Sequence, residues 1–136
     1  MLRPTLDDVL VNVIDSFDTI IKPEVTDDYA SSIALTVSNL LRHVRARAEH
    51  EPAALWDDNN DLRALLRELD VAAPTERADD VYPSLAVLID EAVELRTALD
   101  TYVVQHPGDE RVRAYLARQL ERQRPWMIEA WSGARR

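Results

Sequence analysis

The sequence predicts an all-α protein, an antiparallel four-helix bundle with an additional short helix and a C-terminal amphipathic segment. Apolar residues recur every three or four positions in several stretches, the spacing of one helix face. Glycine occurs only at Gly108 and Gly133, and capping residues or prolines stand at the expected helix ends. A chain of 136 residues has the size of one ordinary domain, so we expect a single helical-bundle domain over 1–136.

The first helix is expected over about 5–22. Thr5 followed by Asp8 forms a variant of the capping box behind Pro4, and Pro23 should end the helix. Its apolar stripe consists of Leu6, Leu10, Val13, Phe17 and Ile20.

The second helix is expected from Thr26 to about Glu49, before Pro52. Thr26 can cap it, and Asp27 and Asp28 place negative charge at the positive end of the helix dipole. Its stripe consists of Ile33, Val37, Leu40, Val44 and Ala48. Such stripes must be buried against each other, and this requirement predicts the bundle.

A short connecting piece, Pro52 to Trp56, should follow, with Trp56 filling a gap in the core. Asp61 can then cap a two-turn helix that ends at Leu69. The stretch 71–80 contains a proline and several charges, so we expect the one substantial loop there.

The third helix should open at Pro83-Ser84 and end near His106, and the fourth should start at Asp109. Pro125 should stop or kink the fourth helix, leaving Trp126 to Trp131 as a separate amphipathic segment. The third stripe consists of Leu85, Leu88, Ala92, Leu95, Leu99 and Tyr102. The core positions of the fourth helix are Val112, Tyr115, Leu116, Gln119 or Leu120, and Gln123.

Composition excludes several classes of protein. The chain has no cysteine, so disulfides, thiolate metal sites and a cysteine nucleophile are ruled out. A net charge of −9 disfavours binding to nucleic acid. The beginning lacks the features of a signal peptide and no long apolar run follows, so we expect a cytoplasmic protein without a membrane partner. Arginine-rich, alanine-rich composition is typical of a GC-rich bacterial genome.

Charge is unevenly distributed along the chain. Residues 1–30 are acidic, with two basic residues, whereas residues 111–136 carry seven arginines against two glutamates. Two interpretations fit this pattern. The first and last helices pair across their edges within one chain, or the arginine-rich end meets an acidic partner or a second copy.

One polar column is a candidate ligand site. Tyr29, Thr36, His43 and His50 recur every seven residues on the second helix, with Arg47 beside them. His43 and Arg47 could bind a carboxylate or phosphate between two helices. The alternative is that these residues are ordinary half-buried positions at the edge of the core.

The sequence favours no metal and no cofactor. Three acidic pairs at spacing three resemble the magnesium ligands of all-helical pyrophosphatases, but their positions relative to the apolar stripes do not bring them to a common pocket: Asp15 with Asp18, Asp58 with Asp61, and Glu91 with Glu94. Asp57, Asn59 and Asp61 resemble a calcium loop, yet Leu62 stands where that loop needs glycine. We therefore expect a capping cluster there. No histidine has the carboxylate spacing of a di-iron site.

The tail is the feature most suggestive of an interface. Trp126, Met127, Ile128 and Trp131 place large apolar side chains behind Pro125, and tryptophan and methionine are enriched where proteins meet. Arginines such as Arg118, Arg122 and Arg124 would form its rim, opposite Asp15 and Asp18 of a partner. Alternatively, the tail folds back and closes the end of the bundle.

Part of the chain resembles a known family. The residues concerned are the run Ala34-Leu35-Thr36-Val37-Ser38-Asn39-Leu40-Leu41, then Arg45, Arg47, Glu49 and Pro52, then Leu62-Arg63-Ala64-Leu65-Leu66. They look like a family of small bacterial helical domains often encoded beside aminoglycoside-phosphotransferase-like kinases and acyl-CoA dehydrogenases. The resemblance implies an accessory role next to an enzyme of small-molecule or acyl metabolism. It carries over no catalytic residue.

The sequence holds no motif that names a reaction. We therefore expect a non-catalytic interaction or accessory protein of bacterial metabolism that self-associates as a homodimer, with a neighbouring metabolic enzyme as a further partner. The alternative is a small-molecule-binding or metal-dependent hydrolytic helical bundle that uses the polar column.

Overall fold

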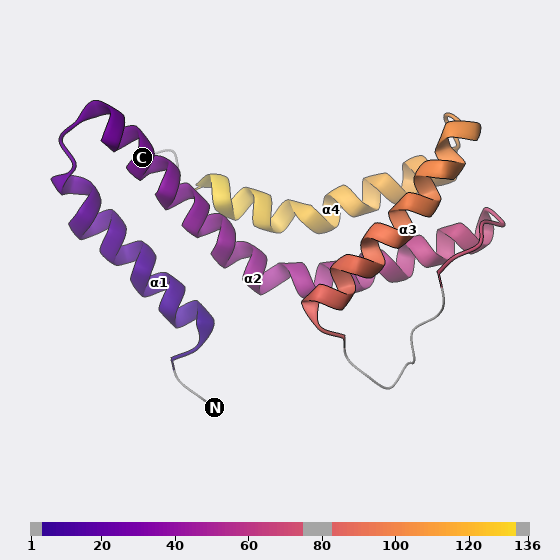
Figure 1. The fold of residues 1–136 in the computed structure, drawn as a ribbon, viewed down its shortest axis with the longest axis horizontal. Coiled ribbons are helices and arrows are strands. Elements are labelled where there is room, and N and C mark those ends of the chain that lie inside the picture. The colour runs from indigo at the N-terminus through magenta and orange to yellow at the C-terminus, as the bar shows by residue number, and fades with distance from the viewer. Residues whose placement is uncertain (1–3, 75–82, 133–136) are drawn as a thin grey trace. The chain divides into compact units, whose positions relative to one another are not determined.

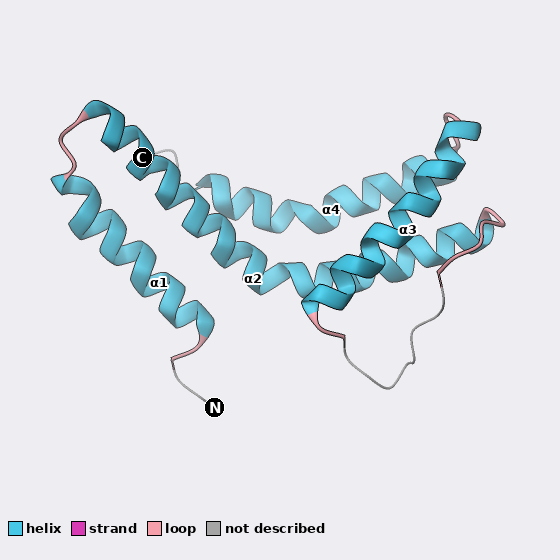
Figure 2. Cartoon of the chain, in the orientation of Figure 1, coloured by secondary structure: helices cyan, strands magenta, loops and turns pink. Residues whose placement is uncertain are grey.

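The computed structural model describes residues 4–74 and 83–132, with side chains up to residue 127. This part of the chain contains helices and connecting turns and no strand (Figure 2), which confirms the all-α class. The elements are α1 (Leu6–Ser16), a π-helical turn (Phe17–Ile21), a 3-10 turn (Lys22–Glu24), α2 (Asp28–Glu68), α3 (Leu85–Gln105) and α4 (Glu110–Ser132). The chain divides into two compact units, residues 1–51 with 124–136 (unit 1) and residues 52–123 (unit 2).

The predicted start of the first helix is confirmed. The backbone N–H of Thr5 donates to Asp8 Oδ2 over 2.9 Å, and the N–H of Asp8 donates to Thr5 Oγ1 over 3.1 Å. Helical structure continues past Ser16 through one π turn, Phe17–Ile21, and a 3-10 turn that contains Pro23. The π turn, which widens the helix by one residue, was not predicted.

The second helix is longer than predicted. It begins behind Asp27, whose Oδ1 accepts a hydrogen bond from the N–H of Ala30 over 2.8 Å, and it runs through Pro52 to Glu68. The expected break at Pro52 and the expected cap at Asp61 are therefore wrong. Proline weakens a helix, but the leucines that follow it are buried in unit 2, and this packing outweighs the local cost.

In unit 1, α1 runs antiparallel to the first half of α2 (Figure 1). Asp7, near the start of α1, pairs with Arg45, whereas Asp18, beyond its end, contacts Ser38 and pairs with Arg42. Among the described side chains of this unit, few apolar ones are buried: Ile14, Ala34 and Ala46. The two helices therefore meet through small and polar residues.

In unit 2, three helices share a conventional hydrophobic core. Its buried residues are Leu62, Leu65, Leu66 and Leu69 of α2, Leu95 and Leu99 of α3, and Val112 and Tyr115 of α4. Ser84 caps α3 by accepting a hydrogen bond from the N–H of Val87 over 3.3 Å, close to the predicted boundary. Most of the predicted third stripe is buried, although Leu85 is exposed.

A tight turn joins α3 to α4. Gly108 has a φ of 87°, which few other residues tolerate, and Asp109 accepts hydrogen bonds from the N–H of Arg111 and the hydroxyl of Tyr102, both over 2.9 Å. Helix α4 begins where predicted and contains Pro125 without ending there, so the separate segment predicted after this proline is wrong. The loop predicted over 71–80 is described only as far as residue 74, and the rest lies outside the described residues.

The predicted burial of the first two stripes is wrong. The exposed fractions are 64% for Leu6, 45% for Val13 and 66% for Ile20 in the first stripe, and 47% for Ile33, 58% for Leu40 and 53% for Val44 in the second. Helices α1 and α2 contact each other a quarter turn away from these residues. The two stripes therefore lie beside the contact between the helices and are not buried in it.

Five charged residues at the two ends of the chain have partners other than those of the predicted pairing between the acidic beginning and the arginine-rich end. Arg111, Arg118 and Arg122 form ion pairs with carboxylates of unit 2. The acidic groups Asp7 and Asp18 pair with arginines of α2. These five side chains therefore have partners within their own unit, on the adjacent helix or, for Arg111, in the turn before α4.

Candidate functional site

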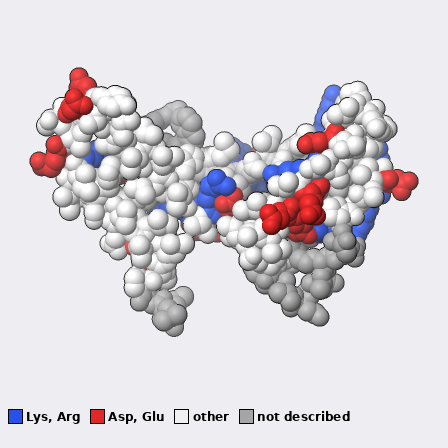
Figure 3. All heavy atoms as spheres, viewed as in Figure 1, with Lys and Arg blue, Asp and Glu red and all other residues white. Residues whose placement is uncertain are grey.

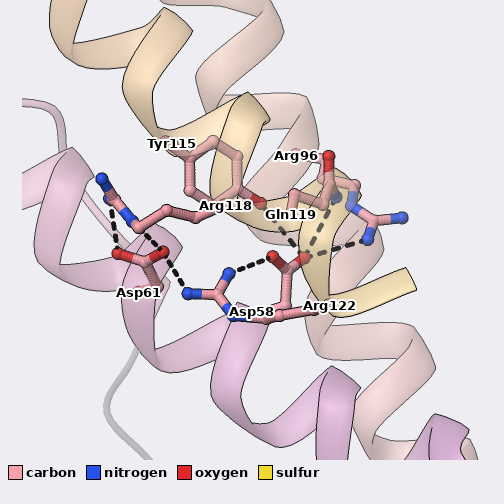
Figure 4. Close-up of polar contacts among 7 residues, drawn as sticks. All are labelled: Asp58, Asp61, Arg96, Tyr115, Arg118, Gln119 and Arg122. Carbon is pink, nitrogen blue, oxygen red and sulfur yellow. Dashed lines mark hydrogen bonds and ion pairs between the residues drawn. The ribbon is translucent and has the colours of Figure 1, made fainter. Parts of the chain in front are cut away.

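The most elaborate polar cluster in the described residues centres on Asp58 in unit 2 (Figure 4). Asp58, on α2, is only 4% exposed, and side chains from the two other helices of the unit, α3 and α4, reach it. Its Oδ2 accepts hydrogen bonds from the Tyr115 hydroxyl, Gln119 Nε2 and Arg96 Nη2, each over 3.1 Å. Its Oδ1 accepts one from Arg122 Nη1 over 3.0 Å.

Asp61 extends this cluster one helical turn along α2. Arg118 binds its two oxygens through Nε over 2.9 Å and through Nη2 over 2.8 Å, and Arg122 binds Oδ2 over 2.5 Å. Figure 4 shows the guanidinium of Arg122 between the two carboxylates. Together with Arg96, three guanidinium groups therefore face two carboxylates.

The surroundings of Asp61 and Tyr115 shift the pKa of each group. The hydrogen bond from Arg118 and the charges of Arg118 and Arg122 lower the pKa of Asp61, although partial burial opposes the shift. Burial and the neighbouring Asp58 raise the pKa of Tyr115, so its hydroxyl stays protonated and donates. Three donors contact Oδ2 of Asp58 and one contacts Oδ1, so the carboxylate is held mainly by partners from the protein itself.

A second polar cluster lies on the neighbouring side of α2. Asn59 Nδ2 donates to the carbonyl of Leu88 over 2.9 Å and to Glu91 Oε2 over 3.1 Å, and Arg63 forms an ion pair with Glu91. Asn59 is 1% exposed and Arg63 is 7% exposed. These contacts join α2 to α3 and explain why polar residues are buried among leucines.

The three acidic pairs singled out in the sequence do not form open sites. Asp58 and Asp61 face arginines, Glu91 pairs with Arg63, and Asp18 pairs with Arg42. Residues 57–61, compared above with a calcium loop, are helical, so the predicted capping cluster is wrong. Within the described residues, no group of three histidines or acidic side chains is placed to hold a metal ion.

The polar column on α2 does not converge. Tyr29 is 77% exposed, and Thr36 donates to the carbonyl of Ser32 over 3.1 Å. Arg47 forms an ion pair with Glu51 one turn further along, and this contact raises the pKa of its guanidinium. His43 and His50 are both half-buried. These residues follow one side of a helix and line no common groove among those described.

A groove does lie between α1 and α2, at residues that the sequence analysis did not combine. Its volume is about 410 Å³. It is lined by Val11, Ile14, Asp15, Asp18, Thr19, Arg42, Arg45 and Ala46. Because Asp18 pairs with Arg42 and accepts a hydrogen bond from Ser38, the charges around the groove are largely satisfied within unit 1. These bonds outweigh the effect of burial and lower the pKa of Asp18.

The feature that sequence reasoning missed is an exposed apolar surface on unit 1, which we call the apolar hairpin face. Its exposed members are Leu6, Val13, Ile20, Ile33, Leu40 and Val44, and its half-buried members are Leu10, Phe17 and Val37. On the side seen in Figure 3, the part of the molecule that holds α1 and the first half of α2 shows mostly uncharged atoms. The sequence shows both apolar stripes, but their helical spacing predicts burial in an internal core.

The tail is described only in part. Trp126 is half-buried, Met127 is 49% exposed, and the side chains of Ile128 and Trp131 lie outside the described residues. Trp56, expected in the core, is half-buried. Of the residues predicted for the rim of a tail interface, Arg118 and Arg122 are bound to Asp61 and Asp18 is bound to Arg42.

Comparison of the chain with protein-family models, with curated proteins and with solved structures gives no match. None of the helices in the described residues is both long and apolar enough to cross a membrane.

Proposed function

We propose that this protein is a non-catalytic interaction or accessory protein that self-associates, forming a homodimer. The observation that carries the proposal is the apolar hairpin face, where side chains such as Leu6, Ile20 and Leu40 are more than half exposed. A contiguous apolar surface is costly in water, and monomeric soluble proteins rarely keep a large one without using it for contact.

The polar clusters of unit 2 also support a non-catalytic role. Asp58 and Asp61 hold α2, α3 and α4 together, and their oxygens are occupied by donors from the protein itself. Their geometry fits a structural clamp better than a reaction centre. The polar column supplies no argument for the small-molecule-binding alternative, because its members do not meet.

The remaining parts of the proposal come from the sequence. The resemblance of residues 34–66 suggests a neighbouring enzyme of small-molecule or acyl metabolism as a further partner. A bacterial source and a cytoplasmic location fit the composition, and the net charge of −9 disfavours nucleic acid. We also propose an antiparallel four-helix bundle as the arrangement of the helices, with Trp126 to Trp131 as an amphipathic C-terminal segment.

Sedimentation equilibrium tests the self-association. We expect a concentration-dependent mass that approaches twice the 15.5 kDa of the chain. A mass of one chain at every concentration up to about 1 mM, where only very weak association would escape detection, rejects the homodimer. Native mass spectrometry of freshly purified protein serves as an independent check, because a co-purifying small molecule would favour the ligand-binding alternative.

A further inference from the structure

We infer that the apolar hairpin face is covered by the same face of a second copy, related by a two-fold axis, so that two hairpins form an intermolecular four-helix bundle. This inference rests on the proposed self-association and identifies the surface that would mediate it. It differs from the tail interface expected from the sequence, which involves Trp126 to Trp131.

The first half of α2 and α1 form an antiparallel helical hairpin (Figure 1), and its geometry places both apolar stripes on one side. Along α1, Asp7 and Ile14 point toward α2 or border the groove between the helices, and Leu6, Leu10 and Val13 lie about a quarter turn away at 100° per residue. Along α2, the stripe is offset from Ser38 and Arg45 by a similar angle in the same rotational sense. Because the helices are antiparallel, these offsets turn the two stripes to the same face.

The face lacks the charges of an ordinary solvated helix surface. No charged residue occurs between Tyr29 and Leu41 or between Val9 and Ile14, in a chain that is 30% charged. The charges of the hairpin lie elsewhere. Asp18 and Arg42 meet between the helices, and the pair of Arg47 and Glu51 stands near the end of the α2 stripe. An uncharged centre with charges at its edges is the pattern of a protein interface.

A groove of about 240 Å³ opens beside this face, between the start of α1 and α2. Leu6, Leu10 and Ala48 supply its apolar lining, and the ion pair of Asp7 and Arg45 and the side chain of Glu49 supply its polar lining. A groove of this kind can receive an apolar side chain of a facing helix, as in the knobs-into-holes packing of helix bundles.

A second copy is the occupant that this face fits. A hairpin with two parallel stripes is half of a four-helix bundle, and an identical hairpin supplies the other half with matching spacing. The face spans 15 residues from Leu6 to Ile20 on its first side and 12 residues from Ile33 to Val44 on α2, so it is ~20 Å long, and two helices are ~20 Å wide. Each copy therefore offers ~400 Å², and the pair buries ~800 Å², the size of a weak, reversible contact.

Three glutamate variants of the full-length chain test the inference. Leu40→Glu places a charge in the middle of the face, at a side chain that is 58% exposed. Leu120→Glu is the matched control, because Leu120 is 64% exposed on α4 and lies outside the face. Met127→Glu tests the tail. Circular dichroism of each variant at low concentration verifies that the helical content is unchanged.

We expect Leu40→Glu to raise the dissociation constant of the dimer at least ~100-fold, because two-fold symmetry buries the new charge twice. Leu120→Glu should change the dissociation constant by less than about threefold, because its position is exposed and lies outside the contact. If Leu40→Glu dimerises like the unmodified chain, the inference is wrong while the proposed self-association stands. If Met127→Glu alone gives monomers, the tail is the interface. If the unmodified chain is monomeric throughout, the proposed function itself fails.

Salt provides a second measurement that does not depend on a variant. The hairpin interface contains no charged pair at its centre, and each copy carries a net charge of −9, so screening should reduce repulsion between copies. We expect the dimer to tighten between 50 mM and 500 mM sodium chloride. A dimer that weakens several-fold over this range contradicts the inference and favours an interface held by ion pairs, such as the arginine rim predicted for the tail.

Discussion

The two units of this protein are built from similar helices but are stabilised differently. Unit 2 buries leucines from three helices and surrounds Asp58 with donors. Unit 1 buries Ile14 and two alanines, and its apolar stripes are exposed. The comparison shows that helical periodicity alone does not say whether a stripe is buried within the chain or reserved for another molecule. Four predictions test the comparison, in order of decreasing effect.

The largest effect is expected at the centre of unit 2. Asp58→Ala removes a carboxylate whose side chain is 6% exposed and leaves Arg96 and Arg122 without this partner. We expect a loss of about 3–5 kcal/mol in the free energy of unfolding, the range for breaking a buried ion pair. Urea denaturation measures it. In unit 1, Asp7→Ala removes an exposed pair with Arg45 and should cost less than ~1 kcal/mol. Equal losses would contradict the difference between the units.

Shortening a leucine to alanine should also have a different effect on the free energy of unfolding in the two units. Leu66 has no exposed surface, and Leu66→Ala should destabilise the protein by about 2–5 kcal/mol through lost burial and a cavity. Leu40→Ala, measured in dilute solution where dimers are absent, should change the free energy of unfolding by less than ~0.5 kcal/mol. A large loss for Leu40→Ala in the monomer would mean that the second stripe belongs to an internal core.

Acid should weaken both units. The pKa values of Asp18 and Asp61 are below their ordinary value of 3.8 in the folded protein, so the unfolded chain binds protons at higher pH. Their stabilising contributions are complete above about pH 5 and are lost as the pH falls through 3.8 toward the folded pKa values. Urea midpoints at pH 7 and pH 3.5 measure the loss. Asp61→Asn should reduce the difference between the two midpoints, and an unchanged difference would argue against the lowered pKa of Asp61.

The smallest effect is expected for the polar column. Replacing both His43 and His50 with glutamine should change the free energy of unfolding by no more than ~1 kcal/mol, because both are half-buried residues at the edge of a helix. Thermal unfolding with and without a chelator is measured on the same samples, and we expect no shift of the melting temperature. If the double variant lost several kcal/mol in its free energy of unfolding, or no longer bound a co-purifying ligand, the polar column would be supported as a ligand site.

Much of the fold could be predicted because it depends on local signals. The capping box at Thr5 and the start of α3 behind Ser84 depend on short-range hydrogen bonds that residue types encode directly. The predicted end of the helix before Pro52 is wrong because tertiary packing of Leu62 and its neighbours keeps α2 continuous, although proline locally disfavours a helix. Propensity rules do not contain that packing.

The site was harder to predict than the fold. Asp58 and Asp61 stood out as an acidic pair, but their partners Arg96, Arg118 and Arg122 are far away in the sequence and depend on how three helices align. Spacing within one helix cannot reveal such partners. The apolar hairpin face was read as core for a related reason, because a stripe looks the same whether its cover is intramolecular or a second chain.

The prolines inside α2 and α4 stand near the positions where these helices pass from one unit to the other, and this affects how the protein unfolds locally. Helix α2 passes from unit 1 to unit 2 at Pro52, and α4 carries Pro125 beside its own crossing after Gln123. Each proline withholds one N–H from the helical ladder, so both chain crossings are weak points in the backbone hydrogen bonding. Native-state hydrogen exchange should therefore reveal two cooperative opening events, one for each unit, with the amides of unit 1 exchanging first.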